Sequence, residues 1–202
     1  MELRAAVRSR RMVRNYQPDR PIPRELVDPM LNLAIRAPSA GNTQGWHFLV
    51  LDDLPSRTAF WAATADGPPD RWRAGMQNAP VLVVCLSDRS AYLDRYAEPD
   101  KGWTDRDEAR WPVPYWHVDT GMAAMILLLA AQEAGLGACL FGVPPQCWPA
   151  FFAAFDVPPG LAPVCVVSLG YPAPDHRSPS LKRGRRPLDA VRSYGRFAPP
   201  AG

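Results

Sequence analysis

The sequence predicts an α+β fold, and three observations carry that prediction. Apolar runs typical of strands and amphipathic stretches typical of helices follow one another without the regular alternation of a doubly wound parallel sheet. The 202 residues are 47% hydrophobic and 10% aromatic, which is too apolar for a disordered chain and sufficient for a buried core. One predicted helix is apolar on nearly every side, which indicates that it lies at the centre of the fold. We expect a single domain covering residues 1–202.

Four segments have helical composition. Residues 2–11 begin the chain, and residues 24–36 carry a clear apolar stripe that must end before Pro38. Residues 118–134 are the nearly all-apolar helix, which we expect to pack against a partner subunit as well as against its own sheet. Residues 145–155 form the fourth predicted helix.

Four apolar runs are predicted as strands, at residues 46–51, 80–87, 138–141 and 163–169. The second of these is the most strand-like because it is rich in β-branched residues. Residues 100–116 contain prolines and tryptophans without periodicity and are predicted to form a long loop.

Basic residues gather at both ends of the chain. The net charge is only +3, yet residues 1–24 hold seven arginines against two acidic residues. Residues 176–202 hold seven basic residues against one acidic residue, and the chain between these ends is acidic. Such ends indicate a polyanion as ligand, or one small anion bound from both sides. Residues 170–202 are otherwise a proline-rich tail with few core residues.

The sequence does not favour a disulfide framework, a metal site or a membrane span. Cys85, Cys139, Cys147 and Cys165 form no C-x-x-C pair and lie mostly in apolar runs, so we expect buried thiols in a reducing compartment. The longest apolar run, residues 122–131, is too short to cross a bilayer, and the N-terminus lacks a signal-peptide core. We expect a cytoplasmic protein with no metal and no membrane partner.

Three segments carry candidate site residues. Residues 8–16 read RSRRMVRNY, and their guanidinium groups suit phosphate; Arg10 and Arg14 share one helical face if the first helix continues to them. Residues 36–47 read RAPSAGNTQGWH, and their side-chain amides suit a heteroaromatic ring with C=O and N–H edges. Residues 135–144 read GLGACLFGVP, which is no dinucleotide fingerprint because it enters a strand and lacks G-x-G-x-x-G. Each segment taken alone also fits an ordinary loop, cap or solvated surface.

In combination these motifs resemble the nitroreductase family of FMN-dependent oxidoreductases. R-R-x-x-R-x-Y, P-S-x-x-N-x-Q-x-W and G-L-G-A-C occur in the family order, followed by G-Y-P at 170–172 and R-G-R-R-P-L at 183–188. The resemblance spans essentially the whole chain. It implies a nitroreductase-like fold, in which helices flank a central mixed or antiparallel sheet. It also implies a homodimer that holds FMN at the subunit interface, beside the buried central helix.

The resemblance also implies the site. The FMN phosphate would be held by early and late basic residues, so that residues 170–202 complete the site, and Arg14 would stabilise the anionic reduced flavin. Loop residues from the second subunit would contact the ring and ribityl chain, and the third motif would lie beside flavin N5. The implied cofactor-binding residues are Arg10, Arg11, Arg14, Pro38, Ser39, Asn42, Gln44, Leu140, Phe141, Gly142, Arg183 and Arg185. Met12, Gly45 and Val143 depart from the family pattern, which usually has a small polar residue, a proline and a glycine there.

The family's chemistry would be a ping-pong cycle, in which NAD(P)H delivers hydride to flavin N5 and an acceptor then takes the electrons. No catalytic side chain is expected, because the cofactor carries the redox chemistry. The family has a variable lid where this chain has residues 100–116. The aromatic residues Trp103, Trp111, Tyr115 and Trp116 suit a small, flat acceptor such as a nitroaromatic or a quinone, or else fill a dimer interface.

Three alternatives stay open on the sequence. The same fold serves flavin-dependent dehydrogenases or oxidases and oxygen-dependent flavin chemistry that are not driven primarily by a nicotinamide. A flavin-binding protein without turnover is the second alternative. Nucleic-acid binding by the two basic ends is the third and the least favoured, because the family motifs give those ends a common use at one phosphate.

Overall fold

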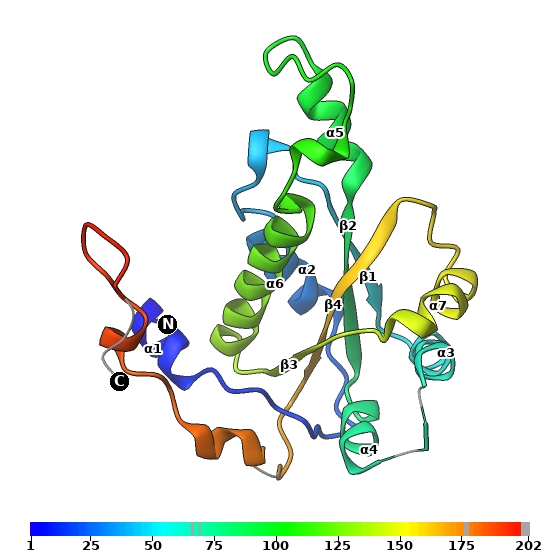
Figure 1. The fold of residues 1–202 in the computed structure, drawn as a ribbon. Helices are drawn as coiled ribbons and strands as arrows, with labels where there is room; N and C mark the ends of the chain where they lie inside the picture. The colour runs from blue at the N-terminus through cyan, green and yellow to red at the C-terminus, as the bar shows by residue number, and fades with distance from the viewer. Residues whose placement is uncertain (66, 69, 176–177, 199–202) are drawn as a thin grey trace.

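The structure is a computed structural model that describes residues 1–65, 67–68, 70–175 and 178–198. At its centre is a four-stranded antiparallel sheet with the strand order β1-β2-β4-β3. The strands are β1 (Trp46–Leu51), β2 (Val81–Asp88), β3 (Gly137–Phe141) and β4 (Leu161–Gly170). Helices cover both faces of the sheet, as Figure 1 shows. The predicted α+β class is confirmed, and the predicted strands agree with the observed ones to within two residues.

Strand β2 separates two layers of core because alternate residues of a strand point to opposite faces. Val81 and Val83 pack into the layer on one face, and Leu82 and Val84 into the layer on the other. All four side chains are completely buried. All four cysteines are buried and carry free thiols, as the sequence predicts.

Helices α2 (Arg24–Ala34) and α6 (Tyr115–Glu133) cover one face of the sheet. Helix α6 buries most of its length against the sheet and α2, which explains its apolar sequence. One side of α6 stays open, however: Val118 and Met125 are 42% and 39% exposed. The helix predicted to be buried on every side is therefore buried only on the sides that face its own chain.

The opposite face carries α3 (Leu54–Thr64), α4 (Arg71–Gln77) and α7 (Trp148–Ala154), whereas α5 (Arg89–Ala97) projects beyond the end of the sheet (Figure 1). Helices α3, α4 and α5 were not predicted. Each of them is preceded by an aspartate N-cap, whose carboxylate accepts the backbone N–H of the residue three positions later. These N-caps are Asp53, Asp70 and Asp88.

Helix α1 (Leu3–Ser9) ends before Arg10, so the prediction that Arg10 and Arg14 share one helical face is wrong. The chain instead becomes extended, because residues 12–17 pair with two other segments. The Val13 N–H donates to the Ala138 carbonyl of β3 at 2.9 Å, and the Gln17 N–H donates to the Tyr171 carbonyl at 2.9 Å. These long-range bonds replace the helical bonds that the local sequence also permits.

Tyr16 fixes this extended segment in the core. Its side chain is 1% exposed, and its hydroxyl lies 2.7 Å from both the Val13 carbonyl and the Ser168 Oγ. Burial raises the pKa of this hydroxyl well above its ordinary value, so it stays neutral. Gly170 makes the contact possible, because a Cβ at that position would meet the Tyr16 ring at 2.5 Å.

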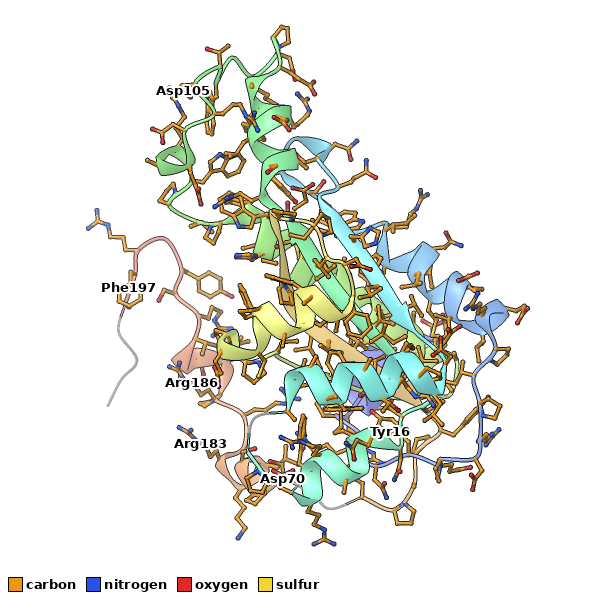
Figure 2. The ribbon with its side chains drawn as sticks, turned by 90° about the vertical axis from the view of Figure 1, so that its right-hand side faces the viewer. Tyr16, Asp70, Asp105, Arg183, Arg186 and Phe197 are labelled. Atoms are coloured by element: carbon orange, nitrogen blue, oxygen red, sulfur yellow. The ribbon has the colours of Figure 1, made fainter. Side chains whose placement is uncertain are left out.

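Beyond β4 the tail forms two short 3₁₀ helices, Pro179–Arg183 and Leu188–Ala190, and reaches away from the body of the chain (Figures 1 and 2). Its apolar side chains contact little of the chain: Leu188, Tyr194 and Phe197 are 62%, 82% and 89% exposed. Residues 176, 177 and 199–202 of the predicted tail lie outside the described residues. Each helix in the described part of the chain is too short or too polar to cross a bilayer.

Candidate functional site

Arginines from both ends of the sequence line one cavity of about 600 Å³, which we call the arginine cavity. The segment 12–17 is bonded to residues 171–173, and this pairing brings the start of the tail alongside the first arginine motif. The cavity is lined by Arg10, Arg11, Met12, Arg14, Asp175, Ser178, Leu181 and Arg185. Arg183 lies on the exposed 3₁₀ helix of the tail, and Figure 2 shows it at the edge of the molecule.

Arg10 carries an unsatisfied donor in this cavity. Its Nη1 atom is buried and has no hydrogen-bond partner among the described residues. A buried charged donor without an acceptor costs free energy, about 1–3 kcal/mol or more. An anion bound in the arginine cavity would remove that cost.

Asp175 organises the same cavity. One of its oxygens, Oδ2, accepts the backbone N–H of Arg14 at 2.8 Å, and the same oxygen lies 3.7 Å from Nη1 of Arg11. The Asp175 side chain is only 9% exposed. This carboxylate fixes the backbone of the arginine segment, and it offsets only part of the charge of four arginines. The cavity therefore keeps a positive potential.

A second cavity of about 490 Å³ adjoins the first, because both are lined by Arg14, Asp175 and Ser178. Helix α4 supplies the far wall, which the sequence did not predict. Its lining residues from this part of the chain are Arg71, Trp72, Ala74, Gly75 and Asn78. Asp70, the N-cap of α4, was the one local signal for this helix.

Aromatic side chains connect that wall to the third motif. The Trp72 ring meets the Phe141 ring edge-to-face with centroids 5.3 Å apart, and Phe141 stacks on Trp61 at 5.7 Å. Leu140 beside Phe141 donates its backbone N–H to the Met12 sulfur at 3.4 Å. Met12, which departs from the family pattern, thus joins the arginine segment to the third motif.

The second motif forms a loop, residues 39–45, at another place in the fold. Asp119 in α6 holds it: one carboxylate oxygen accepts the Ala40 N–H and the Tyr92 hydroxyl, both at 2.8 Å. Gly45 packs against the same tyrosine, and a Cβ there would meet the Tyr92 ring at 2.5 Å. The Tyr92 ring therefore occupies the space that the side chain of a proline at position 45 would need. Ser39 accepts the Gln44 N–H at 2.9 Å, and Pro38, Asn42 and Gln44 are exposed.

The loop and the arginine cavity lie toward opposite ends of α6. Asp119, near the start of α6, binds the loop, whereas Glu133, its last residue, pairs with the N-terminus of the chain. Fourteen residues of helix separate these two contacts, which is about 20 Å along the axis. One chain therefore does not bring the second motif to the arginine cavity.

The predicted acceptor residues form one aromatic cluster beside α5. The Trp111 ring lies 4.6 Å from Tyr96, 5.5 Å from Trp103 and 5.9 Å from Trp116 between centroids. Trp116 is 5% exposed and belongs to the interior of the chain, whereas Tyr115 is 44% exposed. Trp103 and Trp111 are half-buried in the cluster.

Comparison with known proteins identifies the family. The sequence model of the nitroreductase family matches residues 7–171 of this chain. The chain belongs to the nitroreductase family. An NADH dehydrogenase of Thermus thermophilus is 29% identical, with 89% of this chain and 93% of that protein covered. A 5,6-dimethylbenzimidazole synthase of Rhodospirillum rubrum is 32% identical, with 91% and 90% covered. A nitroreductase-like protein of Desulfovibrio desulfuricans, solved with FMN, is 26% identical with a TM-score of 0.72, with 98% and 99% covered.

His117, near the start of α6, is hydrogen-bonded through both ring nitrogens. Its Nδ1 lies 2.9 Å from the Ser87 hydroxyl, and its Nε2 accepts the Trp116 indole N–H at 3.2 Å. Burial lowers its pKa, so the imidazole is neutral near pH 7. Since Nε2 accepts the indole proton, the neutral ring carries its own proton on Nδ1, facing Ser87, and is a poor acid for a substrate.

We predict that this histidine makes the folded state less stable in acid. The folded-state pKa lies below the unfolded value of about 6.5, so the unfolded chain binds the extra proton first and the free energy of unfolding falls as pH drops through that value. His117→Gln should flatten that part of the profile. Urea unfolding at pH 8, 6.5 and 5.5 measures the difference between the two proteins, and parallel profiles would contradict a lowered pKa.

Proposed function

We propose that this member of the nitroreductase family binds FMN with the phosphate in the arginine cavity and oxidises NAD(P)H to reduce an electron-poor conjugated acceptor. Nitroaromatics and quinones are the acceptor class. The observation that carries the proposal is the convergence of Arg10, Arg14 and Arg185 on one cavity in which a buried guanidinium nitrogen lacks an acceptor. The FMN complex of the relative from D. desulfuricans supports the choice of anion.

A phosphate fits the donor set of the arginine cavity. Guanidinium groups present paired N–H donors that match two phosphate oxygens, and they keep their charge at every physiological pH. Arg10 reaches the cavity from the end of α1, and Arg185 reaches it from the tail. We propose that residues 170–202 are an extension of one FMN-binding domain, whose task is to complete this phosphate site.

The adjoining cavity suits a flat ring, because Trp72 lines it and packs against Phe141 of the third motif. When bound, FMN would supply a hydride acceptor for NAD(P)H and an electron donor for the conjugated acceptor. Arg14 lies where the two cavities meet, and its fixed charge would stabilise negative charge on the ring. Asp175 holds the backbone of Arg14 in that place.

A second function has one observation in its favour. The similar protein of R. rubrum is a 5,6-dimethylbenzimidazole synthase. The same flavin site would then serve oxygen-dependent chemistry. If the FMN-loaded protein leaves NADH and NADPH unoxidised whether or not a nitroaromatic is added, this second function is the better one.

The phosphate assignment predicts the behaviour of a double variant. Arg10→Ala with Arg185→Ala removes two charged donors, each worth about 1.5–3 kcal/mol, so the FMN dissociation constant should rise about a hundredfold or more. Fluorescence titration with FMN measures it. Acceptor-dependent NADH oxidation at low FMN should fall in parallel.

The control is Arg4→Ala with Arg192→Ala, which makes the same change in net charge at the same two ends of the chain. Neither residue lines the arginine cavity. Equal loss of FMN affinity in both double variants would show a general effect of charge and would refute the assignment.

We also propose that two copies form a homodimer along the open side of α6. Val118 and Met125 expose an apolar strip on the side of α6 that faces away from the sheet, and the tail exposes Leu188, Tyr194 and Phe197. The separation of the second motif from the arginine cavity within one chain supports this proposal. A second copy would bring its residues Ser39, Asn42 and Gln44 to the ring cavity of the first.

Met125→Glu should therefore weaken both dimerisation and FMN binding. A carboxylate buried without a partner costs about 3 kcal/mol or more, which raises the dimer dissociation constant at least about a hundredfold. Sedimentation equilibrium measures the mass, with and without FMN. Leu54→Glu on α3, another exposed apolar position at 69%, is the control and should leave the mass unchanged. A Met125→Glu protein that stays dimeric would place the interface elsewhere.

A further inference from the structure

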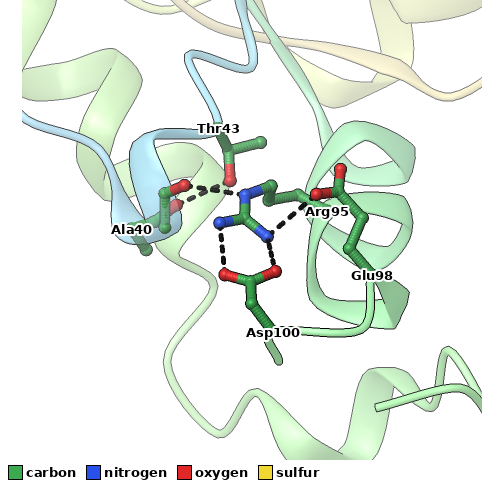
Figure 3. Close-up of polar contacts among 6 residues, drawn as sticks. Ala40, Thr43, Arg95, Glu98 and Asp100 are labelled. Carbon is green, nitrogen blue, oxygen red and sulfur yellow. Dashed lines mark hydrogen bonds and ion pairs between the residues drawn. The ribbon is translucent and has the colours of Figure 1, made fainter. Parts of the chain in front are cut away.

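We propose that Arg95 is a positioning residue that fixes the loop 39–45 and the segment 98–111 to each other, so that both move as one unit. Figure 3 shows the arrangement: the guanidinium of Arg95 on α5 lies between the loop and Asp100, and bonds to both. The inference rests on the proposed function. The loop carries the predicted contacts to the flavin ring, and the segment carries predicted contacts to the acceptor.

On the loop side, Arg95 binds the backbone. Its Nε donates to the Gly41 carbonyl at 3.0 Å. The loop needs such support, because Asn42 and Gln44 have positive φ values of 54° and 55°, in a region that costs a non-glycine residue free energy. Thr43 adds a bond within the loop from its hydroxyl to the Ala40 carbonyl, at 2.6 Å.

On the other side, Arg95 binds the start of the segment 98–111 with both terminal nitrogens. Nη1 and Nη2 donate to the two oxygens of Asp100 at 2.6 and 2.8 Å, and Nη1 also reaches Glu98 at 3.1 Å. The Arg95 side chain is 25% exposed. The bond from Arg95 lowers the pKa of Asp100, so this ion pair persists throughout the neutral range.

From Asp100 the link continues to the predicted acceptor residues. Trp103 donates its backbone N–H to the Tyr96 carbonyl at 2.8 Å, and the two rings lie 5.0 Å apart. Trp111 packs on the same tyrosine. Asp100 lies three residues before Trp103, so its ion pair with Arg95 fixes the chain that leads to the indoles, and Gly41 is connected to Asp100 through a single side chain.

Only an arginine serves both sides at once. Its planar fork donates in fixed directions to the Gly41 carbonyl and to both oxygens of Asp100, whereas a lysine ammonium is a single point that can pair with Asp100 but cannot also reach the Gly41 carbonyl. Arg95→Lys should release the loop and keep the ion pair. Arg95→Gln should release both.

The matched control is Arg89→Gln. Arg89 lies on the same helix and binds Glu108 of the same segment through Nη1, at 3.1 and 3.0 Å to the two carboxylate oxygens. It contributes to holding the segment, but within the described residues its side-chain hydrogen bonds go to Glu108 and not to the loop 39–45. A merely structural role for Arg95 predicts that Arg95→Gln and Arg89→Gln behave alike.

Hydrogen–deuterium exchange on the full-length protein without added flavin tests the link. Arg95→Gln should raise amide exchange about tenfold or more in peptides covering both 38–46 and 98–112, as expected for the loss of charged hydrogen bonds. Arg95→Lys should raise it only in 38–46, and Arg89→Gln only in 98–112. Unchanged exchange in 38–46 for both Arg95 variants would overturn the proposal.

The consequence for function is tested with the FMN-loaded protein. Arg95→Gln should raise the FMN dissociation constant and the KM for a nitroaromatic acceptor together, each about tenfold, whereas Arg89→Gln should leave FMN affinity unchanged. Both parameters unchanged in Arg95→Gln would overturn the positioning role. If the variants show the expected exchange pattern but the wild-type protein binds no FMN, the link is supported and the proposed function is refuted.

Discussion

The pairing of residues 12–17 with β3 and with residues 171–173 is the interaction on which the candidate site depends. The Val13 and Gln17 amides donate to Ala138 and Tyr171, and the Ala173 amide donates to the Asn15 carbonyl. The buried Tyr16 hydroxyl fixes the segment to Val13 and Ser168. The pairing joins the first twenty residues of the chain to the last thirty. Without it, Arg10 and Arg185 would belong to two unrelated surfaces, and the arginine cavity would not exist.

A second set of contacts governs the other half of the proposed site. Asp119 holds Ala40 and Tyr92, and Arg95 holds Gly41 and Asp100, so the loop 39–45 is fixed to both α5 and α6. These contacts lie toward the end of α6 that is remote from the arginine cavity. In the proposed dimer each chain would thus supply a phosphate site to one flavin and a ring-contacting loop to the other.

The sequence predicted those parts of the fold that have strong local signals. The β-branched run in β2 and the apolar helix α6 were both found with nearly correct bounds. Helices α3, α4 and α5 were missed because their sequences lack the clear apolar stripe of α2, and tertiary contacts such as the buried Tyr92 stabilise them instead. The predicted helical face of Arg10 and Arg14 was wrong because pairing with Ala138 and Tyr171 outweighs local helix formation. Motif order predicted the arginines that line the arginine cavity, whereas the only local signal for the wall that carries Trp72 was the helix cap Asp70.

The central claim is that two basic ends of one chain form a single phosphate site. Comparing the affinities of FMN and riboflavin tests it most directly, since the two ligands differ only by the phosphate. Isothermal titration at moderate ionic strength should show FMN binding at least about a hundredfold more tightly, as two or more charged hydrogen bonds require. Equal affinities for the two flavins would contradict the account.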